Sequence, residues 1–280
     1  MRFLILISSL FFISCSSINL VSSSVHSQFG DLEILSLEQK KTNEIILLIN
    51  DDDTVNIEDQ IIAVNKIYNS NKSIYALPKM DYKDVLRKNN TDSPKLRLDN
   101  LIICYHALIK TKKIDTNSVI TVLGIGEGTL LSPHFSVIIR ADHLVLINPY
   151  YFSLENNIVL SMTEKTSNSE RLQNYLRFTE SSDWIEFIEN ASSKKVPDKI
   201  IGSKSMRYYS GYWNINPSEY IQNIQFPIHF VVFDDYIHTS QNNKQTIIGL
   251  EKNTNYQVIR LSGDMFSKFS IEELKRKPLP

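Results

Sequence analysis

Residues 119–129 read VITVLGIGEGT, and they give the clearest indication of the fold. Val119–Leu123 is a short apolar run rich in β-branched residues, as in a buried strand. Gly124, Gly126 and Gly128 follow it at once, and they are three of only eight glycines in 280 residues. Glycine permits backbone angles and close approaches that other residues do not. The stretch therefore predicts a buried strand that ends in a tight turn.

Similar apolar runs lie on both sides of this turn and alternate with segments of helical periodicity. The expected strands are Glu44–Ile49, Ser73–Leu77, His143–Ile147, Ile228–Phe233 and Tyr256–Leu261. The expected helices between them are Ile57–Tyr68, Leu96–Lys110 and Thr239–Glu251. Strands that are apolar on both faces and alternate with helices are typical of a parallel sheet covered on both sides. The sequence thus predicts an α/β fold with a mostly parallel central sheet and helices on both faces.

The strand signals stop between Pro149 and Phe226, where Glu170–Phe178 and Asp183–Glu189 have helical patterns. We therefore expect residues 150–225 to form a helical cap insertion, and residues 31–149 and 226–280 to form the α/β core. An aromatic cluster lies in the cap, at Tyr208, Tyr209, Tyr212 and Trp213. It could line a pocket for an acyl chain or a sugar ring, or it could be the core of the cap.

The first residues have the pattern of a bacterial lipoprotein signal. Arg2 is followed by an apolar run that ends in Phe12-Ile13-Ser14-Cys15, although leucine is more usual than Phe12 in such a signal. We expect residues 1–14 to be a signal peptide, Cys15 to carry acyl chains such as palmitate, and residues 15–30 to be a Ser-rich tether. The protein would then be anchored in the lipid bilayer on the extracytoplasmic side of a bacterial envelope. The alternative is an ordinary signal peptide cleaved a few residues later.

The overall composition narrows the classes of function. Apolar residues make up 42% and charged residues 22% of the chain, and the formal net charge is −1. Nucleic-acid binding proteins are usually basic, so we expect no nucleic-acid partner. Besides Cys15 the only cysteine is Cys104, which we expect to be buried because it lies in an apolar run. Two such cysteines leave no disulfide framework and no cysteine metal site. We expect neither a cofactor nor a metal.

Two known glycine motifs can follow a strand in this way. A dinucleotide-binding loop needs glycine at position 129, where this chain has Thr129, and Glu127 would face the pyrophosphate. The other motif is the nucleophile elbow, G-x-S-x-G, in which the central residue adopts strained backbone angles between a strand and a helix. The spacing of Gly124, Gly126 and Gly128 fits the elbow. One feature disagrees, since Ser132-Pro133 has the pattern of a helix cap and would start the helix late.

From about residue 32 onward, the order of strands, elbow, cap and strands resembles the α/β-hydrolase fold with a cap domain. The resemblance rests on architecture, because the residues that would carry the chemistry are degraded. Gly126 stands at the nucleophile position, and Asp264 lies in the loop where the family has its histidine. Asp234 and Asp235 fit the position of the catalytic acid. The loop that usually begins His-Gly near the oxyanion site reads Asn50-Asp51-Asp52-Asp53.

These losses predict a hydrolase relative without serine-hydrolase activity, since a triad that lacks a member retains little catalysis. The leading interpretation is a non-catalytic binding or interaction module at the cell envelope, with a small molecule or a protein as its ligand. The alternative is an active esterase or peptidase with displaced residues, for which Ser132, His238 and Asp235 are one conceivable set. His134 could also lie on the carboxyl edge of the sheet, whereas His143 and His229 begin strands at the opposite edge.

Several carboxylates fall in the loops of that same edge, at Asp51, Asp52, Asp53, Glu127 and Asp235. Clustered carboxylates repel one another unless a cation lies among them. They could form a site for a cation or a basic ligand, although no EF-hand pattern is present. Otherwise they are solvated acids of the loops.

Overall fold

The computed structural model describes residues 19–27, 30–40, 42–50, 56–69, 71–77, 93–164, 176, 181–193, 197, 199–201, 204–234, 240–262, 268–277 and 279–280. The Cys15 and signal-peptide predictions lie outside these residues. So do the predictions for Asp51–Asp53, Asp235, His238, Asp264 and nearly all of Glu170–Phe178.

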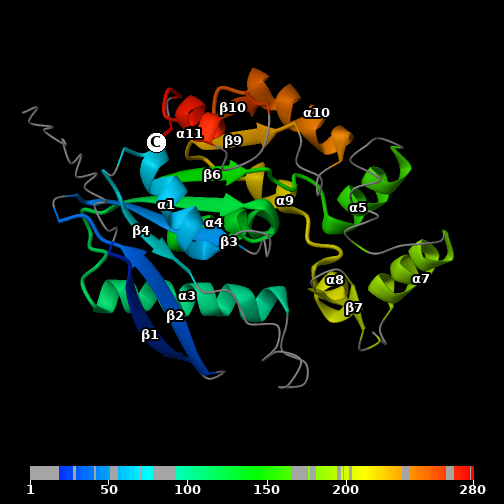
Figure 1. The fold of residues 1–280 in the computed structure, drawn as a ribbon, viewed down its shortest axis with the longest axis horizontal. Helices are drawn as coiled ribbons and strands as arrows, with labels where there is room; N and C mark the ends of the chain where they lie inside the picture. The colour runs from blue at the N-terminus through cyan, green and yellow to red at the C-terminus, as the bar shows by residue number, and fades with distance from the viewer. Residues whose placement is uncertain are drawn as a thin grey trace, which may run out of the picture.

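Eight strands form one sheet in the order β1-β2-β4-β3-β5-β6-β9-β10. Figure 1 shows this sheet running across the molecule from β1 to β10. Their bounds are β1 Val21–Ser27, β2 Gly30–Leu37, β3 Glu44–Asn50, β4 Ser73–Ala76, β5 Val119–Ile125, β6 His143–Ile147, β9 Ile228–Phe233 and β10 Tyr256–Leu261. β1 pairs with β2, and β2 with β4, in antiparallel register, and the remaining pairs are parallel. The predicted mostly parallel α/β sheet is confirmed.

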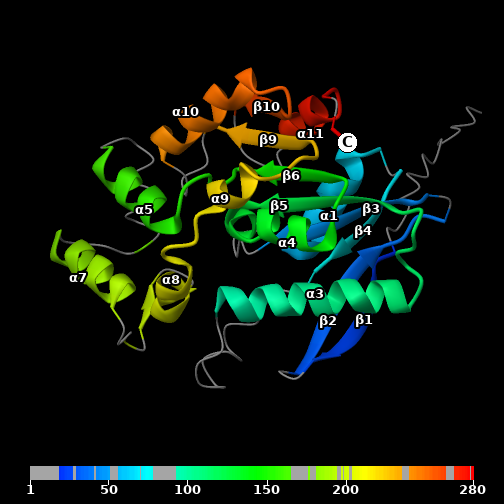
Figure 2. The same ribbon diagram turned by 180° about the vertical axis from the view of Figure 1, so that it is seen from behind.

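Helices cover both faces of this sheet (Figures 1 and 2). The helical elements of the core are α1 Ile57–Ile67, α3 Pro94–Lys110, η1 Gly126–Leu130, α4 Ser132–Ile139, α9 Pro217–Ile221, α10 Gln241–Gly249, η2 Leu250–Lys252 and α11 Lys268–Leu274. One apolar core joins the sheet to α1 and α11, and a second joins the other face to α3, α4, α9 and α10. Residues alternate between these cores along each strand, which explains the runs that are apolar on both faces.

A third apolar core belongs to the cap, beyond the carboxyl ends of the parallel strands (Figure 1). The cap elements are α5 Leu154–Thr163, α7 Ser181–Ser192, β7 Ile200–Ile201, β8 Lys204–Ser205 and α8 Met206–Tyr212. Their core also includes Leu130 and Leu131, which follow the glycine turn. The cap therefore packs directly on the turn rather than standing apart from it.

The tether predicted over residues 15–30 is replaced in part by an edge strand, because β1 spans Val21–Ser27. Most of β1 is exposed, and its serines pair with β2 through the backbone. An edge strand with one partner needs no strong apolar face, so the Ser-rich composition gave no strand signal.

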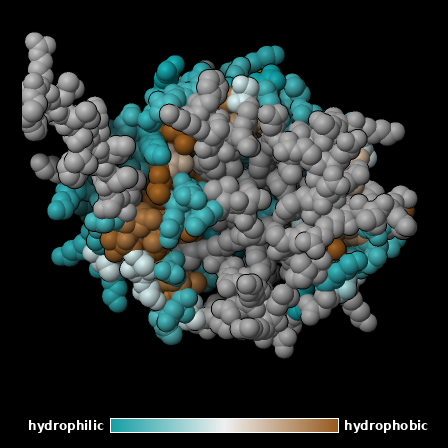
Figure 3. Space-filling view, in the orientation of Figure 1, coloured by the Kyte–Doolittle hydropathy of each residue, from teal (hydrophilic) through white to brown (hydrophobic). Residues whose placement is uncertain are grey.

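In the orientation of Figure 1, the described residues are largely hydrophilic, and hydrophobic ones gather toward the left of the view (Figure 3). Val21, Ile109, Val137, Ile138 and Ile185 are the large apolar residues described as exposed, and they lie on four different elements. Among the described residues, no helix is long and apolar enough to cross a membrane.

Candidate functional site

The glycine turn has the backbone geometry that an elbow requires. β5 ends at Ile125, η1 begins at once with Gly126, and α4 follows from Ser132. Gly126 has a φ of 54°, in the left-handed region that strains residues with a side chain. The chain therefore passes from the strand into a short 3-10 helix without a loop, and the α-helix itself starts late, at Ser132, as the Ser132-Pro133 pattern predicts. Gly126 lies at the tip, in the nucleophile position.

Gly124 permits the close approach of strand and helix. A Cβ atom at this position would lie 2.3 Å from the Ser132 Oγ and 2.9 Å from the Ser132 Cβ. Both distances are shorter than van der Waals contact allows, so a side chain at residue 124 would force Ser132 or α4 to shift. The glycine spacing in the sequence thus reflects two separate steric needs, a positive φ at Gly126 and close packing at Gly124.

Ser132 was interpreted as a helix cap, and the structure corrects this. The N-cap of α4 is Leu131, without a side-chain hydrogen bond. The Ser132 hydroxyl instead donates to the Gly128 carbonyl at 2.6 Å, and the residue is fully buried. A buried hydroxyl that is engaged in this way has no access to a substrate at the edge of the sheet. Ser132 therefore supports the elbow rather than replacing its nucleophile.

Glu127, the residue after the nucleophile position, points into the protein rather than toward solvent. Its side chain is only 6% exposed, and its Oε2 accepts a hydrogen bond of 2.7 Å from the Tyr208 hydroxyl. Tyr208 belongs to α8 of the cap. Glu127 is therefore not part of an open acidic edge, and it connects the elbow to the cap.

Asp234 is the one residue of the predicted acid pair whose structure is described. Its carboxylate lies 2.8 Å from the Arg260 Nε, and its carbonyl accepts a hydrogen bond from the Lys244 Nζ at 2.6 Å. The side-chain charge is thus balanced by a partner on β10. Within the described part of the chain, no group of three or more His, Cys, Asp or Glu residues could hold a metal ion.

The described histidines lie away from a catalytic arrangement. His143 and His229 lie near the starts of β6 and β9, at the opposite end of the sheet from Gly126. His106 is exposed on α3, and His26 lies in β1 beside Asp31 at a distance of 2.9 Å. His134 on α4 stacks on Tyr220, with ring centroids 4.2 Å apart. No hydrogen bond joins His134 to Asp234 or Ser132 among the described contacts.

The aromatic cluster forms the core of the cap. Tyr208, Tyr209, Tyr212 and Trp213 are each 1–2% exposed. Tyr208 stacks on Tyr212 at 4.4 Å, and Phe187 packs edge-on against Tyr209 and Trp213. Side chains so deeply buried among one another do not line an open pocket. The second of the two interpretations, that the cluster is cap core, fits this packing.

A polar network behind the elbow had no recognisable signal in the sequence. Thr129 donates to the Gly126 carbonyl at 2.5 Å and accepts a hydrogen bond from the Tyr150 amide at 3.0 Å. Asn243 on α10 accepts from the Tyr151 amide and donates to the Pro149 carbonyl, both at 2.8 Å. These buried bonds fix the loop after β6 to the elbow and to α10. The Asn-rich composition concealed the signal, because most of the described asparagines are exposed.

Asn148 ends β6 with a φ of 49° and is buried. Its Oδ1 accepts a hydrogen bond of 2.8 Å from the Phe233 amide, and its own amide donates to the Val231 carbonyl at 2.7 Å. Asparagine tolerates this left-handed conformation better than most residues. Asn148 thus holds the carboxyl ends of β6 and β9 together beside the elbow.

Cys104, on α3, is buried as the sequence predicts, with no exposed area. Burial raises the pKa of its thiol to about 12, an effect that the nearby Arg97 partly opposes. The thiolate is the reactive form of cysteine, so this residue does not supply a nucleophile.

Comparison with known proteins gives structural matches only. No family model and no curated protein sequence matches the chain. Among solved structures, it is similar to Est1E from Butyrivibrio proteoclasticus, with a TM-score of 0.59, 12% identity, and coverage of 91% of this chain and 96% of the other. An esterase of Pyrococcus furiosus has a TM-score of 0.60 and 13% identity, with coverage of 92% of this chain and 88% of the other. A bromoperoxidase from Bacillus anthracis has a TM-score of 0.52 and 10% identity, with coverage of 91% of this chain and 96% of the other. The likeness spans sheet and cap together.

Proposed function

The chain has the α/β-hydrolase fold, and from this premise we propose that it is a non-catalytic binding module rather than a hydrolase. The observation that carries the proposal is Gly126 at the tip of the elbow, with a φ of 54°. Nucleophilic catalysis needs a side chain that attacks the substrate. Glycine keeps the backbone shape of the elbow and supplies no attacking atom.

The surroundings of Gly126 support the same proposal. Hydrolases of this fold use the backbone N–H of the residue after the nucleophile to stabilise a developing negative charge. Here that residue is Glu127, whose carboxylate is buried nearby on the Tyr208 hydroxyl. A carboxylate close to this place opposes the charge that the reaction would develop. Ser132, the serine nearest the elbow, is buried and engaged with Gly128.

We propose further that the module is attached to the bacterial envelope through Cys15, facing the extracytoplasmic side. Support comes from the sequence Phe12-Ile13-Ser14-Cys15 after an apolar run. A thioether-linked diacylglyceryl group with an added N-acyl chain anchors a protein stably, whereas one chain alone is marginal. Metabolic labelling with an alkyne analogue of palmitate tests this. Labelling of the protein that disappears with Cys15→Ser supports the anchor, and unchanged labelling or none contradicts it.

A fluorophosphonate probe tests the loss of catalysis. The protein that lacks residues 1–15 is treated with the probe, and its intact mass is measured. We expect no adduct, with circular dichroism showing that the protein is folded. A single adduct that disappears after heat denaturation would reveal an activated serine. That result would favour the competing function, an esterase or peptidase with displaced residues.

A further inference from the structure

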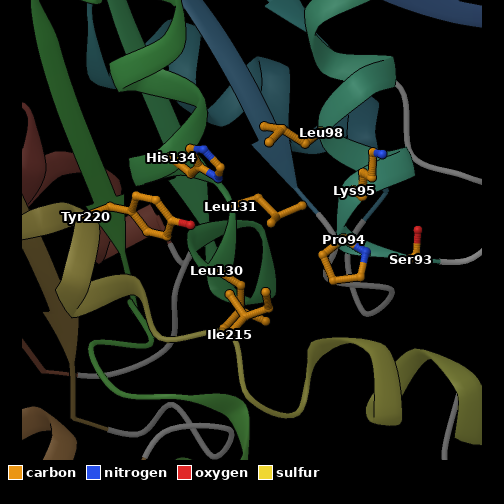
Figure 4. A pocket seen from close by; sticks show the side chains of 9 residues that line it. All are labelled: Ser93, Pro94, Lys95, Leu98, Leu130, Leu131, His134, Ile215 and Tyr220. Carbon is orange, nitrogen blue, oxygen red and sulfur yellow. The ribbon is translucent and has the colours of Figure 1, made fainter.

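A pocket of about 370 Å³ lies between α3, the elbow and the chain that leaves the cap. Three segments far apart in the sequence line it (Figure 4). The lining residues are Ser93, Pro94, Lys95 and Leu98 of α3 and its cap, Leu130, Leu131 and His134 of the elbow and α4, and Ile215 and Tyr220. Its volume falls near the lower end of the range of about 300–1,000 Å³ for small-molecule sites. The pocket therefore has room for one slender molecule.

Most of the lining is apolar. Pro94, Leu98, Leu130, Leu131 and Ile215 supply only hydrocarbon. Leu130 and Leu131 are almost completely buried, so the wall that they form is fixed by the packing of the elbow. An aliphatic chain placed here would leave water for an apolar surface.

The stacked rings of His134 and Tyr220 close the side of the pocket opposite α3, with an angle of 13° between their planes (Figure 4). Burial lowers the pKa of the His134 imidazole. The ring is therefore mainly neutral at pH 7 and adds no charge to this wall. The pair acts as a flat aromatic surface with polar atoms at its edges.

The charge of the pocket comes from one side. Lys95 is exposed at the α3 edge and forms no ion pair with another described residue. The first turn of α3 contains no acidic residue, and none of the described lining residues carries a carboxylate. An anionic group at this edge would meet the Lys95 cation, and the nearest acid along α3 is Asp99, one turn further from the start of the helix. The pocket thus combines an apolar interior with a single positive charge at its edge.

We propose that this pocket binds a fatty acid, with one aliphatic chain between Leu98, Leu131 and Ile215 and its carboxylate at Lys95. The inference rests on the proposed binding function and names the ligand class for it. A fatty acid fits because it has one long apolar part and one compact anionic group. The ligand would contact Leu130 and Leu131, which belong to the elbow that begins at Gly126. Its binding would not require a side chain at the nucleophile position.

Calorimetric titration with sodium dodecanoate tests the proposal. The full chain is used with Cys15→Ser, so that no attached acyl chain competes. We expect one saturable site per chain and weaker binding of dodecanol, which has the same chain without the charge. Exposed ion pairs contribute about 0.2–1 kcal/mol, so Lys95→Gln should raise Kd about two- to five-fold. Lys110→Gln, at the other end of α3, is the matched control and should leave Kd unchanged.

The position of the ligand needs a separate measurement. Ile215→Trp should fill the pocket and abolish binding, with the melting temperature showing that the variant is folded. A photoreactive dodecanoate should label peptides that contain residues 93–98, 130–134 or 215–220. Labels confined to other peptides, or no saturable binding by the unlabelled acid, would overturn the proposal. Failure of binding leaves the inactive elbow unaffected, whereas a fluorophosphonate adduct would overturn the proposed function whatever the titration gives.

Discussion

The hydroxyl of Tyr208 donates a hydrogen bond of 2.7 Å to the carboxylate of Glu127, across the junction of cap and elbow. Both side chains are nearly inaccessible to water, with exposures of 1% and 6%. A hydrogen bond to a buried carboxylate matters most when it is removed, because water cannot replace it. The bond therefore holds the cap against the position where a hydrolase of this fold would bind its substrate.

Tyr208→Phe should destabilise the protein by about 1.5–3 kcal/mol, the usual loss for a hydrogen bond to a charged group. Urea unfolding followed by circular dichroism measures the change. Tyr209→Phe is the control, since the Tyr209 hydroxyl donates to the neutral Ile201 carbonyl over a longer distance of 3.4 Å. In a double-mutant cycle with Glu127→Gln, the two effects should not add. Equal losses for Tyr208→Phe and Tyr209→Phe would argue against a special role for the bond.

Gly124→Ala should destabilise the protein by about 1–3 kcal/mol, as overpacking of a tight core usually does. The new Cβ would collide with the Ser132 side chain. Combining it with Ser132→Gly should recover part of the loss, because that change removes both of the atoms nearest the new Cβ. Gly249→Ala is the matched control, with no atom within 4 Å of its Cβ and a helical φ of −64°. It should be neutral or stabilising by up to about 1 kcal/mol. Thermal melting of these three variants and the unchanged protein measures the differences in stability.

Gly126→Ser restores the side chain that the elbow lacks, and we expect no hydrolysis from it. The serine would adopt a positive φ, at a cost of about 1–2 kcal/mol. His134, the nearest described histidine along the chain, is stacked on Tyr220, and the carboxylate of Glu127 belongs to the next residue. Hydrolysis of p-nitrophenyl acetate and labelling by a fluorophosphonate are the measurements. Labelling of Gly126→Ser but not of the unchanged protein would mean that a base is present and that only the nucleophile was lost.

The elbow shows how far sequence reasoning reaches in this chain. Local patterns predict β5, the turn and the mostly parallel sheet. These patterns are the apolar strand, the three glycines and the alternation of apolar runs with helical segments. The Ser132 contact could not be predicted, since a hydroxyl at a helix start looks like a cap until its distance to Gly128 is known. The Tyr208–Glu127 bond joins residues 81 positions apart, and no local pattern contains such a pair.

The same limit applies to the ends of the chain and to the pocket. Val21–Ser27 forms a strand because β2 provides a partner, which the serines themselves do not indicate. The pocket of Lys95, His134 and Ile215 combines three segments that come together only in the folded chain. The burial of Cys104 was predicted correctly, because a cysteine within an apolar run is usually buried together with its neighbours.

Cys104 should react with alkylating reagents only after unfolding. Its thiol has no exposed area, and burial raises its pKa to about 12, so almost none is thiolate at pH 8. In protein that lacks residues 1–15, Cys104 is the only cysteine, and intact mass reports its alkylation by iodoacetamide. We expect no adduct in the native protein within about an hour and complete reaction in 6 M guanidinium chloride, because a buried thiol reacts only when unfolding exposes it. Rapid native alkylation would show that α3 does not cover the thiol.

Acidification should destabilise the protein through two histidines at the amino edge of the sheet. Burial lowers the pKa of His143 and of His229, and each has an Nδ1 without a partner among the described residues. Lys72 also lowers the pKa of His143, whereas Asp142 and Glu44 raise it. The charge of His143 also lowers the pKa of His229, whereas a hydrogen bond with the Gln257 side chain raises it. The net direction for both is downward, so the neutral form is favoured in the folded state.

The sign of the pH effect follows from this direction. The unfolded chain takes up protons near the ordinary histidine pKa of about 6.5, while the folded chain takes them up only at lower pH. The stabilisation is complete above about pH 6.5 and decreases as the pH falls from there toward the folded pKa values. Urea midpoints measured between pH 7.5 and 5.5 should therefore decline. His229→Leu should reduce the slope, because a leucine at this buried position binds no proton in either state. His106→Gln, on the exposed side of α3, should leave the slope unchanged, and a slope equally steep in His229→Leu would place its origin elsewhere.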